Sequence, residues 1–383
     1  MIFELIRPLD CDFLKFIDGL PSQSLGKKVT FYSGTSFDSF SSYKIAIVGV
    51  LDNRGLENGD DVVDISKIRK AFYSLYPGNW ASKIIDFGDI LPGESLADTY
   101  YLVRKLTEVL LKNNIIPIVI GGSQDLTYAM YRGYDALEQM VNLVCIDDRL
   151  DLVKEGSFPA ESFLSKIIVE EPNNLFNYSN LGYQTYFNSQ EEIDLIEGLY
   201  FEAYRLGEIV NDSKLAEPVL RDADLVSLDL NSIKSGDSGD FGDFKPNGFD
   251  GREICSLARY SGLSDRVSAF GIFNYNNSGN EALLISQIIW YFVEGVNYRS
   301  NEYPFTSKES YFKYIVPLED YDDLVFYKSD VSGRWWIEVE IESSVNKNIT
   351  RKMLLPCDYD DYQSAIEQQV PERWWRALKK SLL

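Results

Sequence analysis

Histidine is absent from this chain of 383 residues. Without an imidazole the chain cannot form a Ser-His-Asp or Cys-His catalytic group, or a zinc site of the HExxH type. The cysteines, at positions 11, 145, 255 and 357, are far apart and form no CxxC pair. This spacing excludes a disulfide framework and a zinc ribbon, and we expect reduced thiols in or near the core. Any metal site would have to use carboxylates, amides or these cysteines.

Positive charge is also scarce, since 37 Lys and Arg residues face 59 Asp and Glu residues and give a net charge of −22. The sequence has no basic run, which argues against nucleic acid or an anionic membrane as a partner. No apolar stretch reaches the roughly 18–20 residues that a membrane span needs, and the first residues do not resemble a signal peptide. We therefore expect a cytoplasmic protein that neither binds nucleic acid nor inserts into a membrane.

Short apolar runs alternate with amphipathic stretches through the middle of the chain. The runs cover 45–50, 84–87, 115–120, 141–146, 223–228 and 267–273, and helical periodicity fills 66–75, 96–111, 125–137, 251–261 and 281–296. Strands of such continuous apolarity are typical of a parallel sheet covered on both faces by helices. We predict a doubly wound, three-layer α/β domain over 45–301, after an N-terminal segment, 1–44. Residues 150–222 look like an irregular excursion between two core strands.

The remaining segment, 302–383, is rich in aromatic residues. A strand is predicted at 335–341 and a helix at 370–378, so this segment is expected to be a small α+β appendage. Its tryptophans are Trp335, Trp336, Trp374 and Trp375. We favour the interpretation that they form the core of the appendage, because exposed tryptophan pairs are rare. The alternative is that they anchor a protein partner.

Polar residues follow four of the predicted strands. Gly121-Gly122-Ser123-Gln124-Asp125 follows one strand, 147–151 the next, 229–232 the third and 274–276 the last. In open parallel sheets ligands bind beyond the carboxyl ends of the strands. Asp147, Asp151 and Asp229 would then lie in a confined space, which is costly unless a cation neutralises them.

These strand ends resemble degraded motifs of the ureohydrolase family, which includes arginase, agmatinase and formimidoylglutamase. GGSQD, the DxxxD of 147–151 and the SxDxN of 227–231 are similar to the family's GGxH, DAHxD and SxDxD, which together hold two bridged Mn²⁺ ions. PNGF at 246–249 and GIFNYN at 271–276 are softer likenesses. The resemblance covers about 45–298 and is greatest to formimidoylglutamase-like proteins with a C-terminal extension. It implies an arginase-type fold, and a homo-oligomer is compatible with it.

The departures from these motifs concern the metal ligands. The resemblance carries the ligand positions over to Gln124, Asp147, Arg149, Asp151, Asp229 and Asn231. The family has His at the first and third positions and Asp at the sixth. The substrate-side carboxylate of the family is replaced by Asn274, so Asn274 and Gln124 are degenerate catalytic positions. Arg149 places a permanent cation where the family has a metal ligand.

We hypothesise that Arg149, together with Lys234, replaces the metals and bridges Asp147, Asp151 and Asp229 in a buried charge network. The favoured function is then that of a catalytically inactive pseudoenzyme without a metal cofactor. Its role would be structural or in protein interaction, with a protein partner or a second copy bound through 302–383. One alternative is a hydrolase of amidino or formimino substrates with a single Mn or Mg ion. The other is a non-catalytic sensor of an acidic small ligand.

Overall fold

A computed structural model of the chain describes residues 2–380 except 35–39, 41, 58, 60–62, 138, 153–157, 243, 278, 303–309, 320 and 343–349. Within these residues the main domain is built on a nine-stranded sheet in the order β1-β3-β2-β4-β9-β8-β5-β6-β7, and every pair in it is parallel. The strands are β1 (Thr30–Phe31), β2 (Ile45–Val50), β3 (Ile84–Ile90), β4 (Ile116–Ile120), β5 (Val141–Ile146), β6 (Leu175–Tyr183), β7 (Glu202–Arg205), β8 (Leu225–Asp229) and β9 (Ala269–Phe273).

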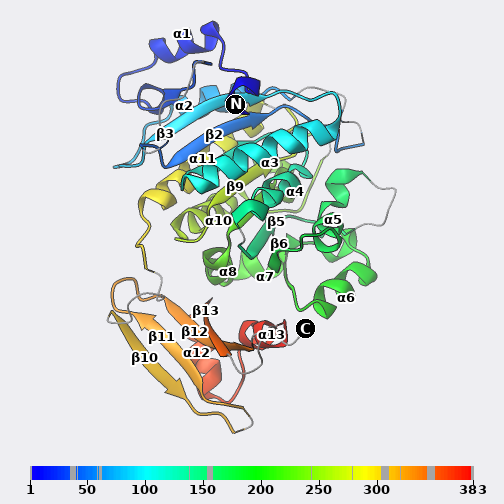
Figure 1. Cartoon of the computed structure of the whole chain (residues 1–383), viewed down its shortest axis with the longest axis vertical. Helices are drawn as coiled ribbons and strands as arrows, with labels where there is room; N and C mark the ends of the chain where they lie inside the picture. Colours follow the sequence, from blue (N-terminus) through cyan, green and yellow to red (C-terminus); the bar gives the residue numbers. More distant parts are fainter. Residues whose placement is uncertain are drawn as a thin grey trace.

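Helices cover both faces of this sheet (Figure 1). One face packs against α1 (Cys11–Gly19), α2 (Ser66–Ser74), α7 (Leu206–Asn211), α8 (Ala216–Asp222), α10 (Gly251–Leu263) and α11 (Gly279–Asn297). The other packs against α3 (Leu96–Lys112), α4 (Leu126–Arg132), α5 (Phe163–Val169) and α6 (Gln190–Gly198). The central strands are buried on both faces, which explains their continuous apolar sequences. The predicted three-layer, doubly wound α/β fold is confirmed.

The segment 150–222 is more regular than its sequence indicated. It contributes β6 and β7, which extend the sheet, as well as the helices α5 to α8. The prediction missed β6 because Asn177, Ser179 and Asn180 interrupt its apolar pattern. These buried side chains are hydrogen-bonded, and the Asn180 amide donates to the Arg149 carbonyl oxygen at 2.7 Å. Polar residues in a buried strand are stable when their hydrogen bonds are made inside the protein.

The residues before β2 pack onto the main domain. β1 pairs with β3, and Phe3 and Ile6 lie in the same apolar cluster as β3. Cys145, Cys255 and Cys357 are buried free thiols, as expected. Cys11 is exposed, because α1 lies at the surface and turns this thiol to solvent. No helix among the described residues has the length and apolarity required to cross a membrane.

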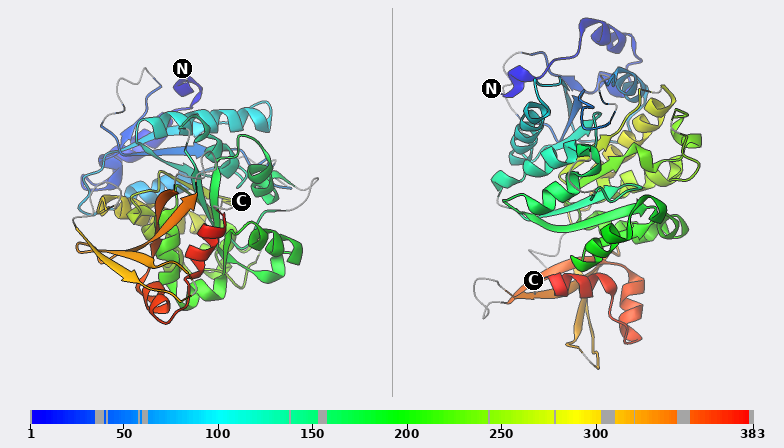
Figure 2. Two further views of the ribbon diagram at one scale, coloured as in Figure 1. Left: turned by 60° about the horizontal axis from the view of Figure 1, so that its bottom comes forward. Right: turned by 90° about the vertical axis from the view of Figure 1, so that its right-hand side faces the viewer.

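The C-terminal region forms a separate four-stranded antiparallel sheet, β10 (Tyr311–Val316), β11 (Leu324–Ser329), β12 (Trp335–Glu342) and β13 (Thr350–Cys357). Two helices follow it, α12 (Tyr359–Ile366) and α13 (Glu372–Lys380). The region lies at the opposite end of the molecule from the N-terminus (Figure 2). The predicted small α+β appendage is thereby observed.

The tryptophans of this region have packing roles. Trp335, Trp336 and Trp374 are buried, and Trp335 and Trp374 belong to the apolar core beneath α12 and α13. Trp375 is half-buried, with its ring 5.6 Å from that of Tyr200 on the main domain. These positions agree with the core interpretation, and they leave three of the four rings inaccessible to a partner.

Arginine side chains join the C-terminal region to the main domain. The Arg221 guanidinium of α8 lies 4.6 Å from the Trp336 ring and donates to the carbonyl oxygens of Trp335 and Cys357. Arg373 of α13 pairs with Glu202 of β7 at 3.1 Å. Burial alone would raise the pKa of Glu202, but Arg373 and Lys380 outweigh burial and lower it. The contact between the C-terminal region and the main domain therefore depends on the ion pair between Arg373 and Glu202, in which each buried charge is neutralised by the other.

Replacing Arg373 with methionine should destabilise the chain by roughly 2–4 kcal/mol, because Glu202 would remain buried without its main cation. Urea unfolding at neutral pH measures the change. Lys15→Met is the control, since it breaks an exposed pair with Asp12 on α1 and should cost less than about 0.5 kcal/mol. Equal stability losses in the two variants would contradict a buried-charge anchor.

Candidate functional site

The carboxyl ends of four neighbouring strands carry the predicted site. The sheet places β4, β9, β8 and β5 side by side, so Gln124, Asn274, Asp229 and Asp147 meet at one edge. The turn after β4 requires glycine: Gly122 has φ of 74°, and a Cβ there would lie 2.7 Å from the Asp52 carbonyl oxygen. This turn brings Gln124 to the edge as a buried side chain.

Four buried aspartates, Asp147, Asp148, Asp151 and Asp229, form what we call the acidic cluster. Carboxylate oxygens of Asp147, Asp148 and Asp229 all lie within 4.8 Å of one another. Asp148 was not among the predicted site residues. It stands where the DAHxD motif has alanine, so the consecutive Asp147-Asp148 pair was the available signal.

Amide groups donate hydrogen bonds to the acidic cluster. The Gln124 side chain donates to Asp147 Oδ2, and the backbone N–H of Arg149 donates to Asp147 Oδ1 at 2.9 Å. Asn231 donates its backbone N–H to Asp229 Oδ1 at 2.7 Å and its side-chain amide to Oδ2 at 3.3 Å. Asn274 accepts the Gln124 backbone N–H at 3.1 Å. Two of the three residues that replace family metal ligands, Gln124 and Asn231, thus donate side-chain hydrogen bonds to Asp147 and Asp229.

The environment favours the protonated forms of these acids. Burial, followed by the charges of Asp151 and Asp229, raises the pKa of Asp147 well above its usual range. Burial also raises the pKa of Asp148 to about 6, against the opposing effect of Lys245. Lys245 Nζ lies 3.9 Å from Asp148 Oδ2. Lys245 has the largest effect of any cation on Asp148, and the charge of Arg149 also acts on Asp148 and Asp151.

The predicted bridging by Arg149 and Lys234 differs from this arrangement. The Arg149 guanidinium is exposed and lies 5.0 Å from the Phe187 ring, and Lys234 pairs with Asp237 at 3.3 Å. Among the described residues, neither cation forms an ion pair with Asp147, Asp151 or Asp229. The physical reason is solvation, since an exposed guanidinium on an aromatic ring avoids the cost of burying its charge.

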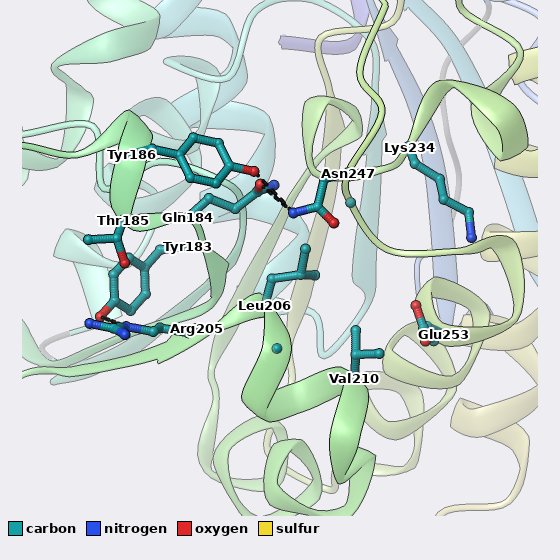
Figure 3. Close-up of a pocket in the computed structure, with 12 residues that line it drawn as sticks. Tyr183, Gln184, Thr185, Tyr186, Arg205, Leu206, Val210, Lys234, Asn247 and Glu253 are labelled. Carbon is teal, nitrogen blue, oxygen red and sulfur yellow. Dashed lines mark hydrogen bonds between the residues drawn. The ribbon is translucent and has the colours of Figure 1, made fainter.

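A cavity of about 340 Å³ is lined by the residues that follow β6 and by residues of α7 (Figure 3). Lys234, Arg205 and Gln184 are among its lining residues. The Gln184 backbone N–H donates to the Asp148 carbonyl oxygen at 3.0 Å, which connects the cavity wall to the cluster. The Asn247 side-chain amide donates to Gln184 Oε1 at 3.1 Å and to the Tyr186 hydroxyl at 3.0 Å. Of the two cations that the acidic-ligand alternative invokes, Arg149 and Lys234, only Lys234 is among the lining residues of this cavity.

Glu281, at the start of α11, is a further buried acid that the sequence did not single out. Its carboxylate accepts the Asn276 backbone N–H at 3.0 Å. Burial raises the pKa of Glu281 to about 8, although the Asn276 hydrogen bond opposes the shift. Asp240, Asp229 and Lys245 are the charged groups that act on it. Acidic residues are common in the first turn of a helix, so the sequence alone does not indicate that Glu281 is buried.

The donor set does not fit a pair of manganese ions. A pair would need ligands on all six positions, but Gln124 and Asn231 direct N–H groups at the shared aspartates, and the side chain of Arg149 points elsewhere. A single cation that prefers oxygen ligands is compatible with the spacing of Asp147, Asp148 and Asp229.

Comparison with known proteins places this architecture in a family. The family model described as the arginase family matches residues 47–292. A formiminoglutamase from Trypanosoma cruzi, in a crystal structure with Mn²⁺, aligns at 16% identity and a TM-score of 0.61, over 69% of this chain and 97% of that one. The formimidoylglutamase of Bacillus subtilis aligns at 13% identity and a TM-score of 0.61, over 70% of this chain and 91% of that one.

The agmatine ureohydrolase of Thermoplasma volcanium aligns at 17% identity and a TM-score of 0.56, over 74% of this chain and 98% of that one. No curated protein matches the chain. The structural likenesses establish the arginase-type fold, and the family match spans more than half of the sequence. The chain belongs to the arginase family.

Proposed function

We propose that the chain is a catalytically inactive member of the arginase family with a structural or protein-interaction role. The observation that carries this proposal is that both carboxylate oxygens of Asp147 accept N–H groups, one from the Gln124 side chain and one from the Arg149 backbone. A metal ion at this carboxylate would have to displace the Gln124 amide. Both carboxylate oxygens of Asp229 likewise accept N–H groups, in this case from the backbone and the side chain of Asn231.

The chemistry of the replaced ligands supports the same conclusion. A pair of metal ions in a hydrolase lowers the pKa of a bound water and polarises the substrate. The chain has no imidazole to serve as a metal ligand, and amide groups stand at two of the ligand positions, Gln124 and Asn231. A network of acids and amides holds the strand ends together without a metal.

A second candidate is a hydrolase of amidino or formimino substrates with one Mn or Mg ion. Two observations favour it: the close spacing of Asp147, Asp148 and Asp229, and the Asp148 Oδ1 atom, which is buried without a hydrogen-bond partner. The arginase-family relatives include a formiminoglutamase with bound Mn²⁺. Activity that depends on Asp148 would support this candidate over the inactive one.

For the interaction role we propose the outer edge of β10 in place of the buried tryptophans. β10 is an edge strand of the C-terminal sheet, and Phe312 and Ile315 on it are 58% and 56% exposed. Edge strands present unpaired backbone groups that can pair with another chain. A second copy of the chain is the occupant that we propose. Sedimentation of the wild type against a Phe312→Lys, Ile315→Lys variant tests it, since charged side chains on an edge strand oppose pairing with another chain. The free thiols agree with a cytoplasmic protein.

Purified chain supplied with Mn²⁺ should release no urea, formamide or ammonia from agmatine, arginine or formiminoglutamate. The reference is an Asp147→Asn, Asp229→Asn variant, which lacks two of the carboxylates that a metal ion would need. Equal background rates in the two proteins are expected. Release by the wild type that is lost in Asp148→Asn would establish the single-metal hydrolase, and release that survives this change would point to a two-metal centre.

Restoring the family ligands should restore metal binding. A variant with Gln124→His, Arg149→His and Asn231→Asp replaces the competing donors with metal ligands, and we expect its affinity for Mn²⁺ to rise about tenfold or more. Calorimetric titration with Mn²⁺ measures the affinity. Gln363→His adds a histidine on the exposed side of α12 and should leave binding unchanged. An unchanged affinity in the restored variant would show that other residues block the site.

The buried Glu281 carboxyl should make stability depend on pH. Its folded pKa is about 8 and its ordinary value 4.5, so the folded state keeps the proton between these values while the unfolded chain releases it. Wild-type stability should therefore fall as pH rises through this range, by up to about 1.4 kcal/mol per pH unit. Glu281→Gln removes this fall.

Urea unfolding at about pH 5 and about pH 8 measures the effect. The stability of Glu281→Gln relative to wild type should increase between the two pH values. Glu197→Gln, on the exposed side of α6, should show no such increase. A constant difference between Glu281→Gln and wild type would mean that Glu281 is ionised in the folded chain.

A further inference from the structure

A second polar cavity lies at the amino ends of the parallel strands, away from the acidic cluster. Its volume is about 230 Å³. Lys44 lies at its mouth, directly before β2, and Ile116 begins β4 in its wall. Ser268 precedes β9, and Arg299 follows α11. We call it the amino-end cavity.

Two cations that line this cavity, Lys44 and Arg299, are not in salt-bridge contact with a carboxylate among the described residues. Arg299 donates to the carbonyl oxygens of Gly262 at 2.9 Å and Val267 at 2.7 Å. Lys44 is exposed and Arg299 is half-buried. A guanidinium that is partly withdrawn from water is normally paired with an acid, so Arg299 is the unusual one of the two.

The acids around the cavity are already engaged. Both oxygens of Asp265, which also lines the cavity, accept backbone N–H groups, from Asn301 at 3.0 Å and Glu302 at 2.9 Å. The third cation of the wall, Arg266, pairs with Asp222 at 2.8 Å and Asp224 at 2.9 Å. The charge of Asp265 acts on both Lys44 and Arg299. The lining of the cavity therefore holds three cations, Lys44, Arg266 and Arg299, and one carboxylate, Asp265.

The pKa shifts of the two cations agree with this geometry. Burial, then the charge of Arg299, lowers the pKa of Lys44 below its usual value. Burial also lowers the pKa of Arg299 to about 10, against the opposing charge of Asp265. An anion between them would reverse both shifts. In a chain with a net charge of −22, such a cavity is a local exception to an otherwise anion-repelling surface.

We propose that the amino-end cavity binds a small oxyanion, a carboxylate or phosphate group, between Lys44 and Arg299. The planar guanidinium can offer two parallel N–H groups to two oxygens of such a group, and the lysine adds a flexible point charge. Ser268 and Asn114 supply neutral polar surface beside them. The site is independent of the acidic cluster, so it stands whether or not the chain is an enzyme.

The test uses the full chain with sodium phosphate and sodium acetate as separate probes, at an ionic strength held constant with sodium chloride. Binding to the folded state raises the melting temperature in a saturable way. We expect this rise with at least one probe, and Lys44→Gln should weaken the apparent affinity about tenfold or more. Comparison of the two probes distinguishes a phosphate site from a carboxylate site.

Lys83→Gln is the matched control, because Lys83 is an exposed lysine directly before β3 and does not line the cavity. It should bind the probe like the wild type. Arg299→Lys keeps the charge but removes the paired N–H groups, and should also weaken binding. The proposal is overturned if neither probe gives a saturable rise, or if Lys44→Gln binds as tightly as Lys83→Gln.

Discussion

The hydrogen bond from the Gln124 side chain to Asp147 is the contact on which this account of the crevice depends. It occupies a carboxylate oxygen that a metal ion would need, and it uses a side chain that stands where the resembling motif has histidine. Asn231 engages Asp229 in the same way. At these strand ends the amide groups of Gln124 and Asn231 donate hydrogen bonds to the aspartates. The aspartates can remain buried because their carboxyl oxygens have hydrogen-bond partners inside the protein.

Buried ion pairs between arginine and acidic side chains stabilise other parts of the molecule, in a chain with few cations. With only 37 Lys and Arg residues, several arginines are buried against acids that would otherwise be isolated. Arg69 binds both Asp86 and Asp89 under the edge of the sheet, and Arg373 joins the C-terminal region to β7. Removing one partner from such a pair costs more than losing a surface pair. The pairing of Lys245 with the acidic cluster belongs to the same pattern.

The sequence predicted the layers of the main domain because strands buried on both faces have no polar alternation. It also predicted that Gln124, Asp147 and Asp229 would meet, since parallel strands place their carboxyl ends at one edge. It could not predict the direction of the Arg149 side chain, because the backbone of a residue can face a cluster while its long side chain points to solvent. The strand β6 was missed since its buried asparagines are satisfied by tertiary contacts.

Anomalous X-ray diffraction from crystals grown with excess Mn²⁺ would test the central claim most directly. The account predicts that the Gln124 amide stays hydrogen-bonded to Asp147 and that no pair of manganese peaks lies between Asp147 and Asp229. Two adjacent peaks bridged by these aspartates, with the Gln124 side chain turned away, would contradict it.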